Sequence, residues 1–192
     1  MGDDLSTASL VSILLLLLFL SAFFSGTETA LMRLNRYKLK NQVRKGNKSA
    51  KILEKLLQKP EKLIGLICLG VNLVNFTAAA LVTIIALKIG GEPFVAVATL
   101  LLTITVLIFC EAAPKTLAAI YPEKLAFPSA LIYYPLMLVS YPMVWLISET
   151  SNAILWLLGF RQTKDRESSL SNEELRTVVR EAGTLVSRKY RS

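Results

Sequence analysis

The chain has 192 residues, of which 53% are hydrophobic, with 22 Lys and Arg against 14 Asp and Glu, no His and two Cys. That length suits one domain or one membrane module, and excludes a multidomain enzyme. Without His, every mechanism that uses imidazole as a base, a relay or a metal ligand is excluded. Two Cys cannot form a disulfide framework. The hydrophobic residues come in long blocks without charge, which is typical of an integral membrane protein.

Three uncharged stretches are long enough to cross a bilayer. They are residues 5–27, 63–87 and 93–110. A spanning helix needs roughly 20 mainly apolar residues. We therefore predict an all-α membrane protein with spans at about 5–31, 63–87 and 94–113. The first span is not a signal peptide, because acidic residues precede it and its apolar stretch is too long.

A fourth uncharged stretch, residues 125–148, contains three prolines and follows Pro122. Proline interrupts the backbone hydrogen bonds of a helix, and a lipid-exposed segment tolerates this poorly. We predict proline-broken juxtamembrane helices over residues 122–160, lying at the interface or packed on the spans. A full fourth span is the alternative, because proline occurs in some spanning helices. Residues 1–160 would together form the transmembrane domain.

The loop at residues 33–62 is strongly basic, with eleven Lys and Arg against two Glu. The connection between the second and third spans carries only Lys88 and Glu92. The positive-inside rule therefore predicts a multi-pass protein of the cell membrane with its N-terminus outside and its C-terminus in the cytosol. Attraction to anionic lipid headgroups explains the basic loop better than nucleic-acid binding, because Tyr37 is its only aromatic residue.

The C-terminal tail contains a helix start. Residues 171–174, Ser-Asn-Glu-Glu, form a capping box that precedes a short apolar stripe. One stripe of this length cannot bury itself. We predict that residues 161–192 form a cytosolic connector helix, which docks on the membrane domain or leads into a further domain beyond Ser192.

Polar side chains recur within the predicted spans. They are Ser21, Ser25 and Glu28 in the first, Asn72 and Asn75 in the second, and Glu111 in the third. A polar side chain at membrane depth is costly and indicates a functional site. At 1.5 Å per residue, Asn75 falls near the middle of a roughly 30 Å core, and Ser21, Ser25 and Glu111 fall in its cytosolic half. Hydroxyl, amide and carboxylate oxygens are hard ligands, which suit Mg²⁺, Ca²⁺ or Na⁺ rather than zinc or copper.

Each of these residues also has a structural interpretation. Ser21 and Asn72 could serve as hydrogen-bonding links between helices. Glu28 could mark the cytosolic end of the first span, and Glu111 could lie at the interface beside Lys115. Both cysteines are interpreted as small packing residues. The coincidence of oxygen-bearing residues on three helices favours a site more strongly than any single member.

Three segments carry a family resemblance. They are FSGTETAL at residues 24–31, Gly70 with LVN at residues 73–75, and EAAPKTLA at residues 111–118. In this order they resemble the signature of the CorC/CNNM (cyclin M) magnesium transporters. The tail sequence SNEEL at residues 171–175 is similar to the connector that leads, in this family, into a pair of cytosolic CBS modules. Cys110 departs from the family pattern, which usually has Gly at this position.

The resemblance implies a homodimer of three-span modules that exports Mg²⁺ from the cytosol in exchange for Na⁺. An intramembrane enzyme is the least favoured function, because the sequence has no His, no paired carboxylates at hydrolase spacing and no nucleophile–base pair. By motif position the Mg²⁺ ligands are Ser25, Asn75 and Glu111, with Ser21 beside them and a backbone carbonyl from Gly70. The implied partners are membrane lipids, a second copy and CBS domains in the longer protein, with no nucleic acid. A membrane anchor that senses Mg²⁺ for a cytosolic module without transporting it is the alternative.

Overall fold

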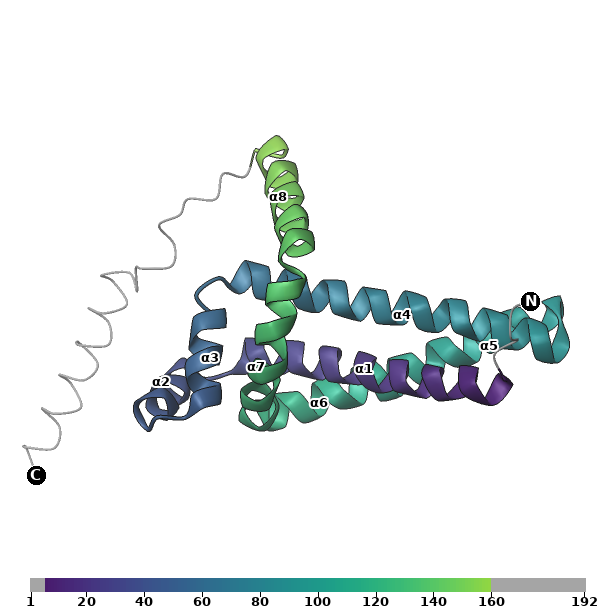
Figure 1. Cartoon of the computed structure of the whole chain (residues 1–192), viewed down its shortest axis with the longest axis horizontal. Helices are drawn as coiled ribbons and strands as arrows, with labels where there is room; N and C mark the ends of the chain where they lie inside the picture. Colours follow the sequence, from purple (N-terminus) through teal and green to yellow (C-terminus); the bar gives the residue numbers. More distant parts are fainter. Residues whose placement is uncertain (1–5, 160–192) are drawn as a thin grey trace, which may run out of the picture. The chain divides into compact units, whose positions relative to one another are not determined.

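The structure is a computed structural model that describes residues 6–159, and every regular element in this range is a helix (Figure 1). In chain order these are α1 (Thr7–Arg33), α2 (Arg36–Arg44), α3 (Lys48–Leu56), α4 (Pro60–Gly90), α5 (Glu92–Thr105), the π-helical turn η1 (Val106–Ala112), α6 (Ala113–Ile120), α7 (Pro122–Val139) and α8 (Tyr141–Leu157). One compact unit, Met1–Glu149, contains every contact discussed below, and a second begins at Thr150. The predicted connector at residues 161–192 lies outside the described residues.

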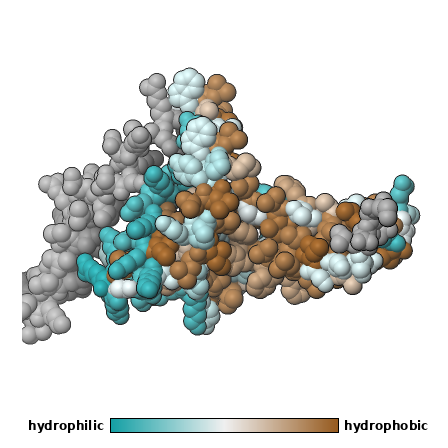
Figure 2. Space-filling view, viewed as in Figure 1, coloured by the Kyte–Doolittle hydropathy of each residue, from teal (hydrophilic) through white to brown (hydrophobic). Residues whose placement is uncertain are grey.

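Three helices are long and apolar enough to cross a membrane. They are α1, α4 and the continuous helix Glu92–Ile120, which comprises α5, η1 and α6. The predicted all-α class with three spans is therefore confirmed. Large apolar side chains such as Phe19, Phe76 and Phe109 are about 70% exposed, as expected for surfaces that face lipid. Hydrophobic residues cover these helices in Figure 2, whereas hydrophilic residues gather over α2 and α3.

Helix α1 is central to the unit. It packs against α4, which runs beside it in Figure 1, and also against η1, α6 and α7. Two glycines permit this close approach: a Cβ at Gly26 would lie 3.2 Å from Pro114 Cβ, and one at Gly70 would lie 2.7 Å from the Phe24 ring. Small residues at such contacts are how helices pack tightly in membranes, where burial of apolar surface provides no drive.

The basic loop between α1 and α4 folds into the short helices α2 and α3. Asn35 and Asn47 cap them, each accepting hydrogen bonds from backbone N–H groups of the first turn. Leu39 of α2 and Leu53 of α3 are buried in the hydrophobic core. We did not predict these helices, because an apolar face of so few residues is hidden among eleven Lys and Arg.

The proline-rich stretch forms two helices, α7 and α8, bent by 83° relative to each other. The break falls at Ser140, however, and α7 continues through Pro128 and Pro135. Each internal proline costs about 3 kcal/mol or more in an isolated helix. Helix α7 tolerates both because it packs on α1 and α3 and buries Tyr133 completely. Together α7 and α8 are apolar enough for a fourth span, but the bend prevents a straight one.

An ion pair joins α2 to α7: Lys38 Nζ lies 2.6 Å from Glu123 Oε1, with side chains 62% and 34% exposed. Because solvent screens such a pair, we expect Lys38→Ala to change the free energy of unfolding by less than about 1 kcal/mol. Thermal unfolding of the detergent-purified protein measures this, with the exposed Lys40→Ala on the same helix as the control. A clearly larger loss at Lys38 alone would mean that the docking of α7 depends on this pair.

Candidate ion-binding site

A side-chain hydrogen bond joins the spanning helices α1 and α4. Ser21 Oγ donates to Asn75 Oδ1 over 2.6 Å. Ser21 is 1% exposed, and Asn75 is half-buried. Between two apolar helices in a membrane, no water is available as a hydrogen-bond partner. The two side chains therefore satisfy each other. The structure thus brings together two of the five predicted site residues.

The third spanning helix joins this pair through Cys110. The thiol is buried, donates to the backbone carbonyl of Leu18 at 3.3 Å, and lies next to the Ser21 hydroxyl. We refer to Ser21, Asn75 and Cys110 as the polar cluster. The sequence led us to interpret Cys110 as a packing residue, and its polar contact with α1 was missed. Its position in the sequence, directly before Glu111, was the one feature that could have indicated a polar role for Cys110.

Glu111 follows Cys110 within the π-helical turn η1. The turn closes with the Ala113 N–H bonded to the Ile108 carbonyl. Pro114 comes next and, having no N–H, cannot donate a hydrogen bond to the carbonyl of Cys110 four residues back. Single π-turns in an α-helix are rare and frequently mark functional sites. The π-turn itself was not predictable from residue types alone.

Ser25 lies one turn beyond Ser21 on α1 and is 1% exposed. Its hydroxyl has no hydrogen-bond partner among the described residues. Other hydroxyls on the spanning helices, such as those of Thr77, Thr83 and Thr103, donate to the carbonyl four residues back. An unsatisfied buried hydroxyl costs about 1–3 kcal/mol, so its retention calls for an explanation.

The other predicted residues have different surroundings. Glu111 is half-buried and, within the part of the chain that the structure describes, forms no ion pair with Lys115. Gly70 lies against the ring of Phe24. Asn72 is exposed, and its amide donates to the Cys68 carbonyl of the same helix at 2.8 Å, so it links no two of the helices that the structure describes.

Acidic and sulfur ligands are sparse. Nowhere in residues 6–159 do three His, Cys, Asp or Glu side chains gather as a possible metal site. A cation held near the polar cluster would therefore take most of its ligands from hydroxyl, amide and backbone oxygens. Such neutral oxygens, together with a single carboxylate, suit a hard cation.

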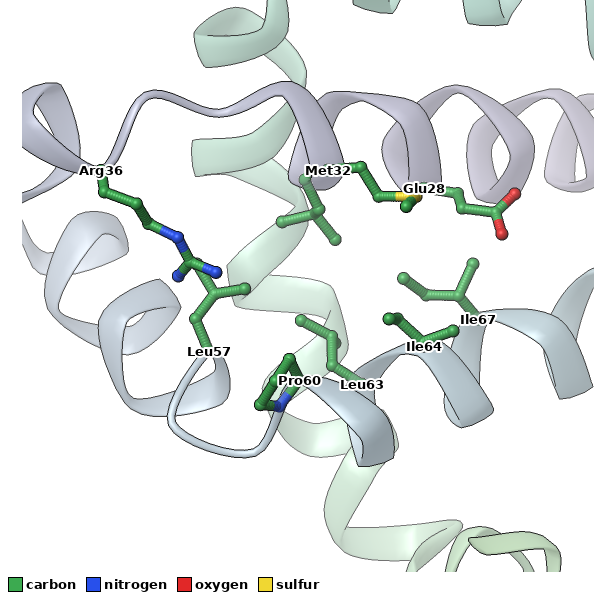
Figure 3. Close-up of a pocket in the computed structure, with 9 residues that line it drawn as sticks. Glu28, Met32, Arg36, Leu57, Pro60, Leu63, Ile64 and Ile67 are labelled. Carbon is green, nitrogen blue, oxygen red and sulfur yellow. The ribbon is translucent and has the colours of Figure 1, made fainter. Parts of the chain in front are cut away.

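Glu28 faces a separate pocket. This pocket, of about 210 Å³, is lined by residues of α1 and α4, by Arg36 at the start of α2 and by Leu57 directly after α3, and Glu28 and Arg36 are its charged residues. Figure 3 shows the two at opposite ends, with Met32 between them and the carboxylate directed away from the guanidinium. Its remaining walls are apolar, including Leu63 and Ile67. Glu28 is therefore part of a pocket wall and, within residues 6–159, forms no hydrogen bond with the polar cluster.

A family model described as the cyclin M transmembrane N-terminal domain matches residues 12–186. The chain belongs to the cyclin M family. Its resemblance to this family, inferred above from three motifs, is thus confirmed. Membership of this transmembrane family agrees with the three spanning helices, and both indicate a multi-pass membrane protein.

Several relatives of this cyclin M domain are known. The UPF0053 inner membrane protein YfjD of Escherichia coli is 46% identical over 170 residues, which cover 88% of this chain and 40% of the relative. A UPF0053 protein of Haemophilus influenzae is 42% identical over 181 residues, covering 94% and 43%. The DUF21 domain-containing protein At1g55930, chloroplastic, of Arabidopsis thaliana is 31% identical over 173 residues, covering 88% and 26%. The chain thus spans about two fifths of the length of the first two.

Proposed function

We propose that this domain carries Mg²⁺ out of the cytosol, coupled to Na⁺ entry. The ligand set consists of the side chains of Ser21, Ser25, Asn75 and Glu111, with a backbone carbonyl from Gly70. Membership of the cyclin M family supports this proposal, as does the meeting of polar groups from all three spanning helices at membrane depth.

The unpartnered hydroxyl of Ser25 carries the proposal. A spanning helix offers every serine a bond to its own backbone, and Ser25 does not make one. Mg²⁺ takes oxygen ligands at about 2.0–2.1 Å in near-octahedral geometry. A bound Mg²⁺ would give this oxygen the partner that the protein does not supply, and thereby offset the cost of burying it.

The bond between Ser21 and Asn75 has a role in the same scheme. Without a cation, the Ser21 proton lies on the Asn75 oxygen that we assign to Mg²⁺. The bond holds this oxygen in place, and when the cation arrives only the O–H proton of Ser21 turns away, so that both oxygens can face Mg²⁺. Glu111 is the single carboxylate of the set, so bound Mg²⁺ keeps one net positive charge. That charge is unfavourable in a low-dielectric interior and promotes release.

Orientation and assembly belong to the proposal as well. With the basic residues 33–62 in the cytosol, Ser25 lies toward the cytosolic end of α1, on the side from which Mg²⁺ is taken. The working unit is a homodimer in a lipid membrane. The longer protein would add CBS domains after this domain, in keeping with the two fifths of the relatives' length that the chain spans.

Ser25→Ala tests the ligand set with two readouts. Removing an unsatisfied hydroxyl should raise the free energy of unfolding without Mg²⁺ by about 1–3 kcal/mol. It should also greatly reduce the stabilisation by Mg²⁺, which for a ligand at 100 times its Kd is about 2.7 kcal/mol in the wild type. Thermal unfolding in detergent with and without Mg²⁺ measures both. Ser12→Ala is the control, because Ser12 is an exposed serine of α1 bonded to the Ala8 carbonyl.

Transport is tested in liposomes that contain the 192-residue chain and a Mg²⁺-sensitive dye. We expect Mg²⁺ flux that increases with an opposing Na⁺ gradient and is lost in Ser25→Ala. Mg²⁺ binding without flux would favour the anchor and sensor function instead. If Mg²⁺ neither stabilises the wild type nor crosses the membrane, the proposed function is wrong.

A further inference from the structure

A buried contact joins α7 to α1 at Thr27, two residues along α1 from the proposed ligand Ser25. The hydroxyl of Tyr133 is hydrogen-bonded to Thr27 Oγ1. Both side chains are 0% exposed, and Tyr133 is the largest fully buried side chain of the described residues. Burying two hydroxyls here requires that each be satisfied by the other or by the backbone.

The positions of the hydrogens follow from the neighbours of Thr27. Its oxygen lies 2.7 Å from the carbonyl of Phe23 and 3.1 Å from that of Phe24. A carbonyl only accepts, so Thr27 donates its single proton to the backbone of α1. Tyr133 must therefore be the donor in the contact between the helices, and Thr27 the acceptor. The acceptor of the Tyr133 hydroxyl proton is thus Thr27 Oγ1, two residues from Ser25 in the sequence.

The ring of Tyr133 extends the contact to α4. Its centroid lies 6.0 Å from that of Phe23 and 6.1 Å from that of Phe24. The Phe24 ring in turn lies against Gly70, where a Cβ would come within 2.7 Å. Tyr133 thus supports both the α1 backbone around Ser25 and the ring that packs on Gly70.

We propose that Tyr133 is a positioning residue of the Mg²⁺ site. It holds Ser25 in place through Thr27, and Gly70 through Phe24, without touching the cation. This inference rests on the proposed function. Residues that hold the ligands of a metal ion in place typically change its affinity by about 10- to 100-fold when altered. We expect Tyr133→Phe to raise the Mg²⁺ concentration for half-maximal thermal stabilisation by about tenfold.

The experiment compares four variants of the 192-residue chain in detergent. Tyr133→Phe removes the donor and Thr27→Val removes the acceptor, whereas Thr27→Ser keeps it. Tyr134→Phe is the matched control, because Tyr134 is 54% exposed on the same helix. Each variant is unfolded thermally over a Mg²⁺ titration at constant Na⁺, and both the Tm without Mg²⁺ and the midpoint of the Mg²⁺ response are recorded.

The inference holds if Tyr133→Phe and Thr27→Val shift the Mg²⁺ midpoint while Tyr134→Phe and Thr27→Ser do not. It is overturned if Tyr133→Phe lowers the Tm but leaves the midpoint unchanged, since the contact would then serve stability alone. If Tyr133→Phe does not fold, the Mg²⁺ midpoint of Thr27→Val decides between the same two outcomes. If Mg²⁺ does not stabilise the wild type at all, the proposed function itself is overturned. If Mg²⁺ stabilises the wild type and Tyr133→Phe with the same midpoint, only this inference is overturned.

Discussion

Replacing Glu111 with Gln is expected to weaken Mg²⁺ binding by at least about 100-fold, because it removes the one carboxylate of the proposed ligand set. At 4 Å and an effective dielectric constant of about 20, one pair of unit charges is worth about 4 kcal/mol. A 100-fold loss corresponds to about 2.7 kcal/mol and is therefore a conservative figure. The midpoint of Mg²⁺-dependent thermal stabilisation measures the loss.

Two further variants complete this test. Glu92→Gln removes an exposed carboxylate at the start of the same continuous helix, and we expect it to bind Mg²⁺ like the wild type. Asn75→Ala removes a neutral oxygen, and we expect a loss of about tenfold, in line with one hydrogen bond of about 1.4 kcal/mol. Equal losses in Glu111→Gln and Asn75→Ala would mean that neutral oxygens dominate the site.

Gly70→Ala is expected to lower the free energy of unfolding by about 1–3 kcal/mol, the usual cost of inserting a methyl group into a packed interior. The new Cβ would lie 2.7 Å from the Phe24 ring. This ring cannot simply swing aside, because Phe24 is 8% exposed and packs against Phe23 and Tyr133. Thermal or denaturant unfolding in detergent measures the effect.

Gly65→Ala is the matched control on the same helix. Its nearest neighbour would be Val144 at 3.9 Å, an ordinary contact. Here the higher helix propensity of Ala should leave stability unchanged or raise it by up to about 1 kcal/mol. Combining Gly70→Ala with Phe24→Leu should recover part of the loss, because the two side chains compete for one space. A Gly70→Ala variant as stable as the wild type would mean that Gly70 does not set the approach of α1 to α4.

The candidate site was only partly predictable. Polar residues within uncharged runs pointed to Ser21 and Asn75, and the structure joins them by a hydrogen bond. Asn72 had the same residue type and nearly the same position, yet it faces outward. Cys110 and Tyr133 were not singled out as polar partners, because each sits in an apolar sequence and its partner lies on another helix.

The sequence by itself determined the membrane location, the all-α class and the course of the three spanning helices. A bilayer satisfies backbone groups only within a helix or a closed barrel, so uncharged runs of this length leave little choice. Only the tertiary structure decided which polar groups meet, where the π-turn forms, and that α7 continues through its prolines. These features depend on how each helix is rotated against its neighbours, and that rotation is set by contacts such as Gly26 with Pro114 and Gly70 with Phe24, which join residues distant in the chain.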